Sequence, residues 1–183
     1  MNKKDGKERI LKVAYKMLVE NKKIEDITIR DIAKRANVGV GLINYHFKSK
    51  EYMLMEALGS ELVIVAKRWS ELANDESNDP KVTLKNMLLE LINLGAEQLS
   101  LIEIAAKFEL TEGDINTPLF ILPCIMRITG KSEDISKIIA YSVISGIQST
   151  AIKRKQFKEY VNIDIEKEDD REKYVDMIIK SIV

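Results

Sequence analysis

The chain has 183 residues, of which 45% are hydrophobic and 32% charged, and its 29 Lys and Arg balance 29 Asp and Glu. The single cysteine, Cys124, excludes an intramolecular disulfide framework and a cysteine-based structural zinc site, because both need several thiols. No uninterrupted run of about 18 apolar residues is present to span a bilayer, and residues 1–9 lead into a charged helix rather than an apolar signal core. We therefore expect a cytoplasmic protein without a membrane partner.

The charge is unevenly distributed along the chain. Residues 1–50 contain 13 Lys and Arg against 6 Asp and Glu, whereas residues 51–183 contain 16 against 23. A basic end attached to an acidic body indicates that the basic end meets a polyanion.

The first predicted helix has apolar residues at the three-and-four spacing of one buried face: Ile10, Val13, Ala14, Met17 and Leu18. We expect it to end near Asn21. A second helix opens at Thr28, whose hydroxyl can accept a bond from the amide three residues on, and Asp31 stands at the capping-box position. This helix should stop at Ala36-Asn37.

A turn at 37–39 leads into a brief segment, 39–46, and Ser49 caps a long amphipathic helix that runs to about Ala73. Residues 74–79 (NDESND) predict a loop. Asp79-Pro80 is a helix start, because it offers an acceptor at the cap and proline in the first turn. One continuous helix from there to about Leu110 is expected.

Thr117-Pro118 repeats the cap-then-proline signal, and Pro123 is expected to kink or end its apolar segment because it lacks an amide donor. Ser132 begins another helix that reaches Ser149, and Tyr174 lies in a final helix after an acidic link. Apolar and polar residues alternate only over residues 161–165, and this segment is too short to predict a strand. The chain is predicted to be all-α.

A helix, a tight turn and a short second helix form the helix-turn-helix pattern, whose second helix lies in the major groove of DNA. Here that helix is residues 39–46. The small Gly39 and Gly41 allow close approach to phosphate, Val40 can touch a thymine methyl, and Asn44 can pair with a base edge or a phosphate.

The residues that follow complete this surface. Tyr45 and His46 can donate to phosphate oxygens, while Lys48 and Lys50 flank the start of the next helix, where free amides already favour an anion. Packing is the alternative role for the aromatic run 45–47, and Phe47 is expected to be a core residue. No second His or Cys lies nearby, so neither a metal site nor a catalytic base is predicted at His46.

The segment TIRDIAKRANVGVGLINYHFKSKEYML, residues 28–54, resembles the DNA-binding signature of the TetR family of transcriptional regulators. The resemblance covers about 45 residues including the first helix. It implies an N-terminal three-helix DNA-binding domain, residues 1–48, joined to a helical ligand-binding and dimerisation domain, residues 49–183.

The resemblance also implies roles for individual residues. Thr28 and Arg30 contact the DNA backbone and Lys50 binds phosphate, whereas residues 39–41 lie against bases and residues 44–46 contact base or phosphate. Gly39 and Asn44 depart from the family, which often has Ser and Tyr at these positions. The set of base-reading side chains is therefore sparse, and the operator sequence does not follow from it.

Small residues recur along one side of the penultimate predicted helix: Ser142, Ser145, Gly146 and Ser149. From the sequence alone this face suits either a close helix contact within one core or an interface between two copies. The resemblance favours a homodimer, in which the last two helices, including Ile178, pair with their copies. A two-fold dimer presents two recognition helices to the half-sites of a palindromic operator.

An adaptable pocket for a small-molecule effector is predicted from polarisable, aromatic and aliphatic side chains in the middle of the chain, although plain core packing is the alternative. The candidates are Met87, Leu91, Phe108, Phe120 and Met126. Glu103, Glu109 and Arg127 lie in or near apolar stretches, where each either orients a charged ligand or faces solvent. No cofactor is predicted.

The sequence therefore predicts a homodimeric regulator that binds an operator in double-stranded DNA, most simply a repressor released by its effector. One alternative is a helical protein-interaction module that has lost DNA binding. The other is a helical enzyme or carrier, against which stands the lack of a phosphate loop, a dinucleotide fingerprint or a nucleophile with its base.

Overall fold

A computed structural model describes residues 3–20, 26–97, 99–111 and 113–182, and these residues form ten α-helices without a strand. The prediction of an all-α chain is confirmed. The helices are α1 (Lys3–Glu20), α2 (Ile29–Arg35), α3 (Val40–His46), α4 (Lys50–Asn74), α5 (Pro80–Glu97), α6 (Leu99–Thr111), α7 (Thr117–Thr129), α8 (Glu133–Ile152), α9 (Arg154–Val161) and α10 (Glu168–Ile182).

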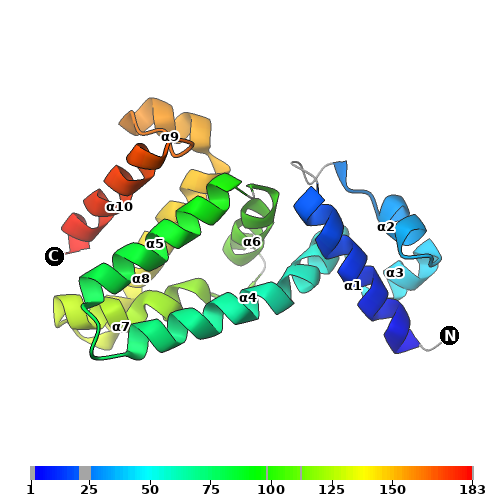
Figure 1. Ribbon diagram of the computed structural model, residues 1–183, viewed down its shortest axis with the longest axis horizontal. Helices are drawn as coiled ribbons and strands as arrows, with labels where there is room; N and C mark the ends of the chain where they lie inside the picture. The colour runs from blue at the N-terminus through cyan, green and yellow to red at the C-terminus, as the bar shows by residue number, and fades with distance from the viewer. Residues whose placement is uncertain (1–2, 21–25, 98, 112, 183) are drawn as a thin grey trace.

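Helices α1, α2 and α3 gather at one end of the molecule, and α4 runs from this group into a larger group formed by α5 to α10 (Figure 1). The expected end of the first helix at Asn21 lies outside the described residues. From α2 through the start of α5, the predicted helix boundaries agree with the structure to within about one residue.

The N-terminal group has its own hydrophobic core, to which α1, α2, α3 and the first half of α4 contribute. Ile10, Ile32, Ile43 and Leu54 are all at most 1% exposed within it. Phe47 is buried in this core, as expected. Ile104 of α6 is also buried in it. The first half of α4 therefore packs with α1, α2 and α3.

The turn between α2 and α3 is set by backbone bonds rather than by glycine. Asn37 has a φ of 51°, the amide of Val38 donates to the carbonyl of Ala33 (3.0 Å), and the amide of Asn37 donates to that of Lys34 (3.2 Å). These paired bonds end α2 in a Schellman motif, because asparagine tolerates the left-handed conformation. The turn fixes the angle at which α3 leaves α2.

The second core lies among α4, α5, α7, α8 and α10. Trp69, Leu88, Ile125, Ile144 and Val175 are each at most 3% exposed there. Because α4 contributes residues to both cores, it is the structural link between the two helical groups.

The expected single helix from Pro80 to Leu110 is wrong, because the structure has two helices, α5 and α6, that pack against each other. A Cβ atom built on Gly95 would lie 3.6 Å from Cγ2 of Ile102. Residues seven apart in a continuous helix are about 10 Å apart along its axis, so the chain must fold back between them. The apolar residues of this region continue at helical spacing through both helices, so the sequence pattern did not predict the change of chain direction between them.

Two further comparisons with the sequence concern the C-terminal group. Pro123 lies inside α7 and does not end it, since the helix continues to Thr129. The helix α9 was not predicted, because its sequence RKQFKEYV has few apolar residues and buries none of them. Arg171 of α10 anchors the link that follows α9 by donating to Asn93 Oδ1 (2.6 Å) and to the carbonyl of Ile165 (3.1 Å).

The helix α8 is long and apolar enough to satisfy a length-and-composition criterion for a membrane span. Its buried side, which includes Ala140, Ile144 and Ile147, packs against α6 and α7 within the helical group. A core helix of a soluble protein satisfies the same criterion, so the observation does not define a membrane segment.

Candidate DNA-binding and effector sites

The outer face of α3 carries the residues that were predicted to read DNA. Gly39, Val40, Gly41, Asn44 and Tyr45 are all exposed, with Tyr45 67% exposed and Val40 39%. Ile43 points the other way and is 1% exposed in the N-terminal core. The helix is thus anchored on one side and presents a polar and small-residue surface on the other.

Nothing inside the chain requires glycine at positions 39 and 41. Gly39 has a φ of −75°, which any residue adopts, and a Cβ atom built at either position meets no atom within 4 Å. By contrast, a Cβ atom on Gly6 would lie 2.9 Å from Cδ2 of Leu42, so α1 and α3 pack closely there. The two glycines of α3 therefore leave free space on the outer surface of the molecule.

The aromatic run 45–47 is divided between surface and core. The rings of Tyr45 and His46 meet edge to face with centroids 5.0 Å apart, and Phe47 is 5% exposed. Nε2 of His46 is buried and has no hydrogen-bond partner among the described residues, and the residue as a whole is half-buried. Tyr45 is thus the most accessible aromatic group of this surface.

Four polar residues flank α3, namely Thr28, Arg30, Lys48 and Lys50. Thr28 caps α2, as predicted: its Oγ1 accepts from the amide of Asp31 (3.1 Å) and donates to the Asp31 carboxylate (2.5 Å). Arg30 and Lys48 are exposed. Lys50 is half-buried, and its Nζ donates to the carbonyl of Ile27 (3.2 Å), so it joins the start of α4 to the residue before the α2 cap.

The start of α4 combines two features that favour an anion. Ser49 caps the helix by accepting from the amide of Tyr52 (3.0 Å), and the positive end of the helix dipole lies at the same place as Lys48 and Lys50. Arg35, on the other side of α2, is paired with Glu20 (2.5 Å). That hydrogen bond holds the pKa of the Glu20 carboxyl below its usual value.

A buried three-helix core, a fixed turn and an exposed second helix define a helix-turn-helix DNA-binding domain. Residues 10–57 match the family model described as bacterial regulatory proteins, tetR family. This match supports a DNA-binding transcriptional regulator of the TetR family. A comparison of the chain with curated proteins finds no match.

A cavity of about 380 Å³ lies among α4, α5, α6, α7 and α8. Leu91, Phe108 and Phe120 line it, whereas Met87 and Met126 do not. Met87 is 1% exposed in the second core, and Met126 is 36% exposed at the surface of α7. The structure therefore brings together three of the five predicted effector residues.

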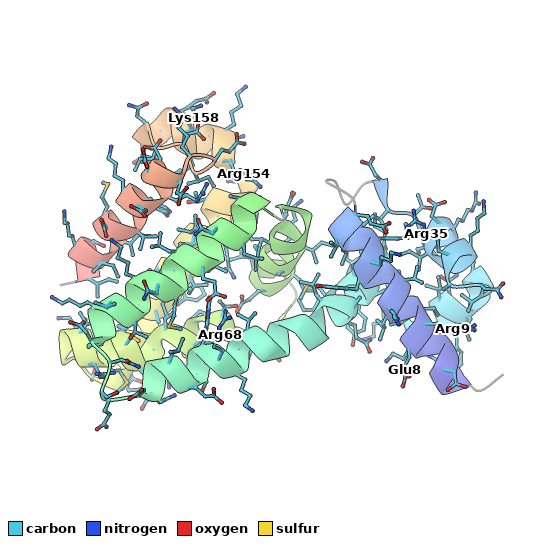
Figure 2. The ribbon with its side chains drawn as sticks, viewed as in Figure 1. Glu8, Arg9, Arg35, Arg68, Arg154 and Lys158 are labelled. Atoms are coloured by element: carbon cyan, nitrogen blue, oxygen red, sulfur yellow. The ribbon has the colours of Figure 1, made fainter. Side chains whose placement is uncertain are left out.

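Sequence reasoning did not associate several other lining residues with this cavity, notably Trp69, Glu90 and Gln148. Trp69 is 3% exposed and donates through Nε1 to Glu90 Oε2 (2.9 Å), and Glu90 also pairs with Arg68. Figure 2 labels Arg68 on α4 beside α5. These residues lie on three helices that are well separated in sequence, so no local pattern connects them.

Glu109 joins three elements at the wall of the cavity. Its Oε1 accepts from the amides of Asn116 and Thr117 (both 2.7 Å), and its Oε2 accepts from Thr117 Oγ1 (2.6 Å) and Gln148 Nε2 (2.6 Å). The carboxylate thus ties the end of α6 to the start of α7 and to the middle of α8.

The other two charged candidates have structural partners outside the cavity. Glu103 pairs with Lys107 (2.6 Å), one turn further along α6. Arg127 donates to the carbonyls of Asp75 (3.1 Å), Glu76 (3.2 Å) and Asn78 (2.6 Å), so it closes the loop between α4 and α5. Among the described residues no group of His, Cys, Asp and Glu is arranged to hold a metal ion.

The small residues of α8 lie on its outer side. Ser142, Gly146 and Ser149 are exposed and Ser145 is half-buried. They continue a stripe that begins with Ile135 (49% exposed) and Ile138 (65% exposed). Ile178 of α10 is half-buried and packs against the second core.

Proposed function

We propose that the protein is a homodimeric, cytoplasmic repressor that binds a palindromic operator and is released by a small-molecule effector. The observation that carries the DNA-binding part is the outer face of α3. It is exposed and contains two glycines that neither the backbone conformation nor the internal packing requires. Free space of this kind suits the close approach of a DNA backbone or base edge.

The proposed contacts follow from position around α3. Val40, Asn44 and Tyr45 face the bases or their phosphates, and Gly39 and Gly41 allow the approach. A ring of flanking groups holds the phosphates: Thr28, Arg30, His46, Lys48 and Lys50. Backbone contacts of this kind fix the position of the helix, and the few base contacts supply the specificity.

The dimer part of the proposal is supported by the stripe on α8. Ile135 and Ile138 are large apolar groups at the surface, and the small residues after them allow another helix to approach closely. A second copy packing on this stripe with two-fold symmetry would contribute the same face, as a self-complementary interface requires. Ile138→Glu is expected to shift sedimentation towards the monomer, whereas Leu72→Glu, at a 41%-exposed position on α4, is not.

The effector part is supported by the position of α6. Its residues Ala105 and Phe108 line the cavity, while Ile104 is buried in the N-terminal core. A ligand that displaces α6 therefore acts directly on the packing of the DNA-binding domain. A difference of about 1 to 3 kcal/mol in ligand affinity between two arrangements would weaken operator binding roughly 5- to 150-fold.

The DNA-binding part is tested by fluorescence anisotropy of the full chain on the duplex upstream of its own gene, with random duplex as competitor and at two salt concentrations. Competitor-resistant binding that weakens as salt rises is the expected result. Failure on that duplex leads to a selection from genomic fragments. Failure there as well favours the interaction module that has lost DNA binding.

A matched pair of variants locates the interface. Tyr45→Ala is expected to weaken operator binding at least 10-fold, since the ring is 67% exposed on α3. Tyr160→Ala removes an 89%-exposed ring on α9 and should leave affinity unchanged. Equal effects of the two substitutions would contradict the assignment of α3.

A further inference from the structure

The cavity has an unusual balance of charge for a largely apolar site. Three aromatic side chains line it together with aliphatic ones, namely Trp69, Phe108 and Phe120. Its ionisable lining residues among those described are Glu90, Glu109 and Asp114, and none is Lys, Arg or His. The lining is therefore apolar and formally acidic.

The acidic residues differ in how their charge is offset. Glu90 is paired with Arg68, so the two charges largely cancel. Glu109 accepts four hydrogen bonds, all from neutral donors, and no described ion pair involves it. No described cation therefore offsets Glu109 beside the apolar space, where an electrostatic interaction is stronger than in water.

These hydrogen bonds also determine how Glu109 can act on a ligand. A carboxylate offers about four acceptor positions, and the four donors already occupy them. Attraction from Glu109 is then electrostatic and does not depend on a new hydrogen bond. Quaternary and protonated amines should both respond to it.

We propose that the cavity binds a lipophilic monocation: a molecule with an aromatic or aliphatic body and one positively charged amine or ammonium group. The body fills the space beside Trp69, Phe108 and Phe120, whose ring faces also favour a cation. The charge lies towards Glu109 and Asp114. This assignment rests on the proposed function, because it names the chemical class of its effector.

A matched ligand series tests the charge preference. The full-length protein is titrated near pH 7 with 4-phenylbenzylamine, 4-phenylbenzyl alcohol and 4-phenylbenzoate, which differ chiefly in charge. Binding is followed by calorimetry and by the fluorescence of Trp69, the only tryptophan in the sequence. We expect the amine to bind roughly 10- to 100-fold more tightly than the alcohol, and the benzoate more weakly still.

Three results would overturn the proposal: equal affinity for amine and alcohol, tighter binding of the benzoate, or no binding of the amine at millimolar concentration. Ala105→Phe places a ring at a lining position and should abolish binding of the whole series. If amine binding survives that substitution, the ligand is bound elsewhere and the proposal fails.

A pair of carboxylate substitutions tests the source of the attraction. Glu109→Gln should remove most of the preference for the amine while the alcohol still binds. Glu103→Gln, also on α6 but outside the cavity lining, should preserve the preference. Asp114→Asn provides a second lining variant should Glu109→Gln loosen the connection between α6 and α7, and a preference unchanged in both lining variants contradicts the proposal.

Operator release distinguishes this proposal from the proposed function. If the amine binds in the cavity but leaves operator affinity unchanged, the effector role fails and the ligand class stands. If an anionic compound binds in the cavity and releases the operator, the effector role stands and the ligand class fails.

Discussion

The two helical groups differ in what their polar residues do. In the C-terminal group, polar side chains with non-local partners maintain the fold: Arg127 closes a loop, Glu109 joins three helices and Arg171 anchors α10. In the N-terminal group, the exposed face of α3 has few side chains with such a structural role. A Cβ atom at Gly41 would meet no other atom within 4 Å. Side chains without a structural role in the fold are available to an outside partner, and this distinguishes the proposed DNA-reading face of α3 from the C-terminal group.

The largest expected effect is at the point where the two groups meet. Ile104 of α6 is 4% exposed in the N-terminal core, so Ile104→Ala leaves a cavity there and should cost about 2 to 4 kcal/mol of unfolding free energy. Urea denaturation measures this loss. Val82→Ala, at a 56%-exposed position on α5, should change stability by less than about 0.5 kcal/mol. A cost for Ile104→Ala as small as that of Val82→Ala would mean that α6 does not support the DNA-binding domain.

The next effect tests the structural role of polar groups in the C-terminal body. Arg127→Ala leaves three loop carbonyls without their donor, and we expect a loss of about 1 to 2 kcal/mol because the site is exposed and water replaces part of the interaction. The exposed Lys131→Ala provides the control, with no loss expected. Thermal unfolding measures the two variants. Equal midpoint temperatures would disprove the role of Arg127 in closing the loop.

Local signals predicted most of the N-terminal group. Thr28, Ser49 and Asp79-Pro80 each mark a helix start, because a cap depends on residues within one turn. The buried face of α1 followed from its apolar spacing in the same way. The exposed residues of α3 followed from the helix-turn-helix pattern, although their contacts with DNA stay predictions.

Non-local packing explains what the sequence did not predict. The reversal between α5 and α6 brings Gly95 close to Ile102, and a continuous apolar stripe does not reveal it. The cavity joins Trp69, Glu90 and Gln148 from three different helices, and no spacing rule connects them. Met87 and Met126 illustrate the same limit, since helical periodicity alone does not distinguish a core, a cavity and a surface position.

A smaller loss of stability is expected at a helix cap, which can be compared between the start of α4 and the start of α8. Ser49 accepts from the amide of Tyr52 (3.0 Å), so Ser49→Ala should cost about 1 kcal/mol. Ser132 stands at the start of α8 but makes no capping bond through its side chain, and Ser132→Ala should cost less than about 0.5 kcal/mol. The two substitutions are chemically identical, so equal costs in chemical denaturation would show that the cap of α4 contributes no special stability.

The smallest expected effect is a loss of stability at acidic pH. It involves one ion pair in each helical group. Arg35 lowers the pKa of Glu20, and Lys158 lowers that of Asp164, both through side-chain hydrogen bonds (Figure 2 labels the two cations). A carboxyl with a lowered pKa in the folded state stabilises the fold above its usual pKa, and this stabilisation is lost as pH falls through the folded-state value. The stability difference between the original protein and Arg35→Ala should therefore be present at pH 7 and shrink towards pH 3.

Lys158→Ala should show the same behaviour. Each carboxyl keeps a second group that lowers its pKa, namely the amide of Glu166 (3.2 Å) for Asp164 and Lys16 for Glu20. Denaturation at a series of pH values measures both differences, and added salt should reduce each of them since both pairs are solvent-accessible. A difference for Arg35→Ala that stayed constant down to pH 3 would mean that the guanidinium contributes through packing against α1 rather than through the charge of Glu20.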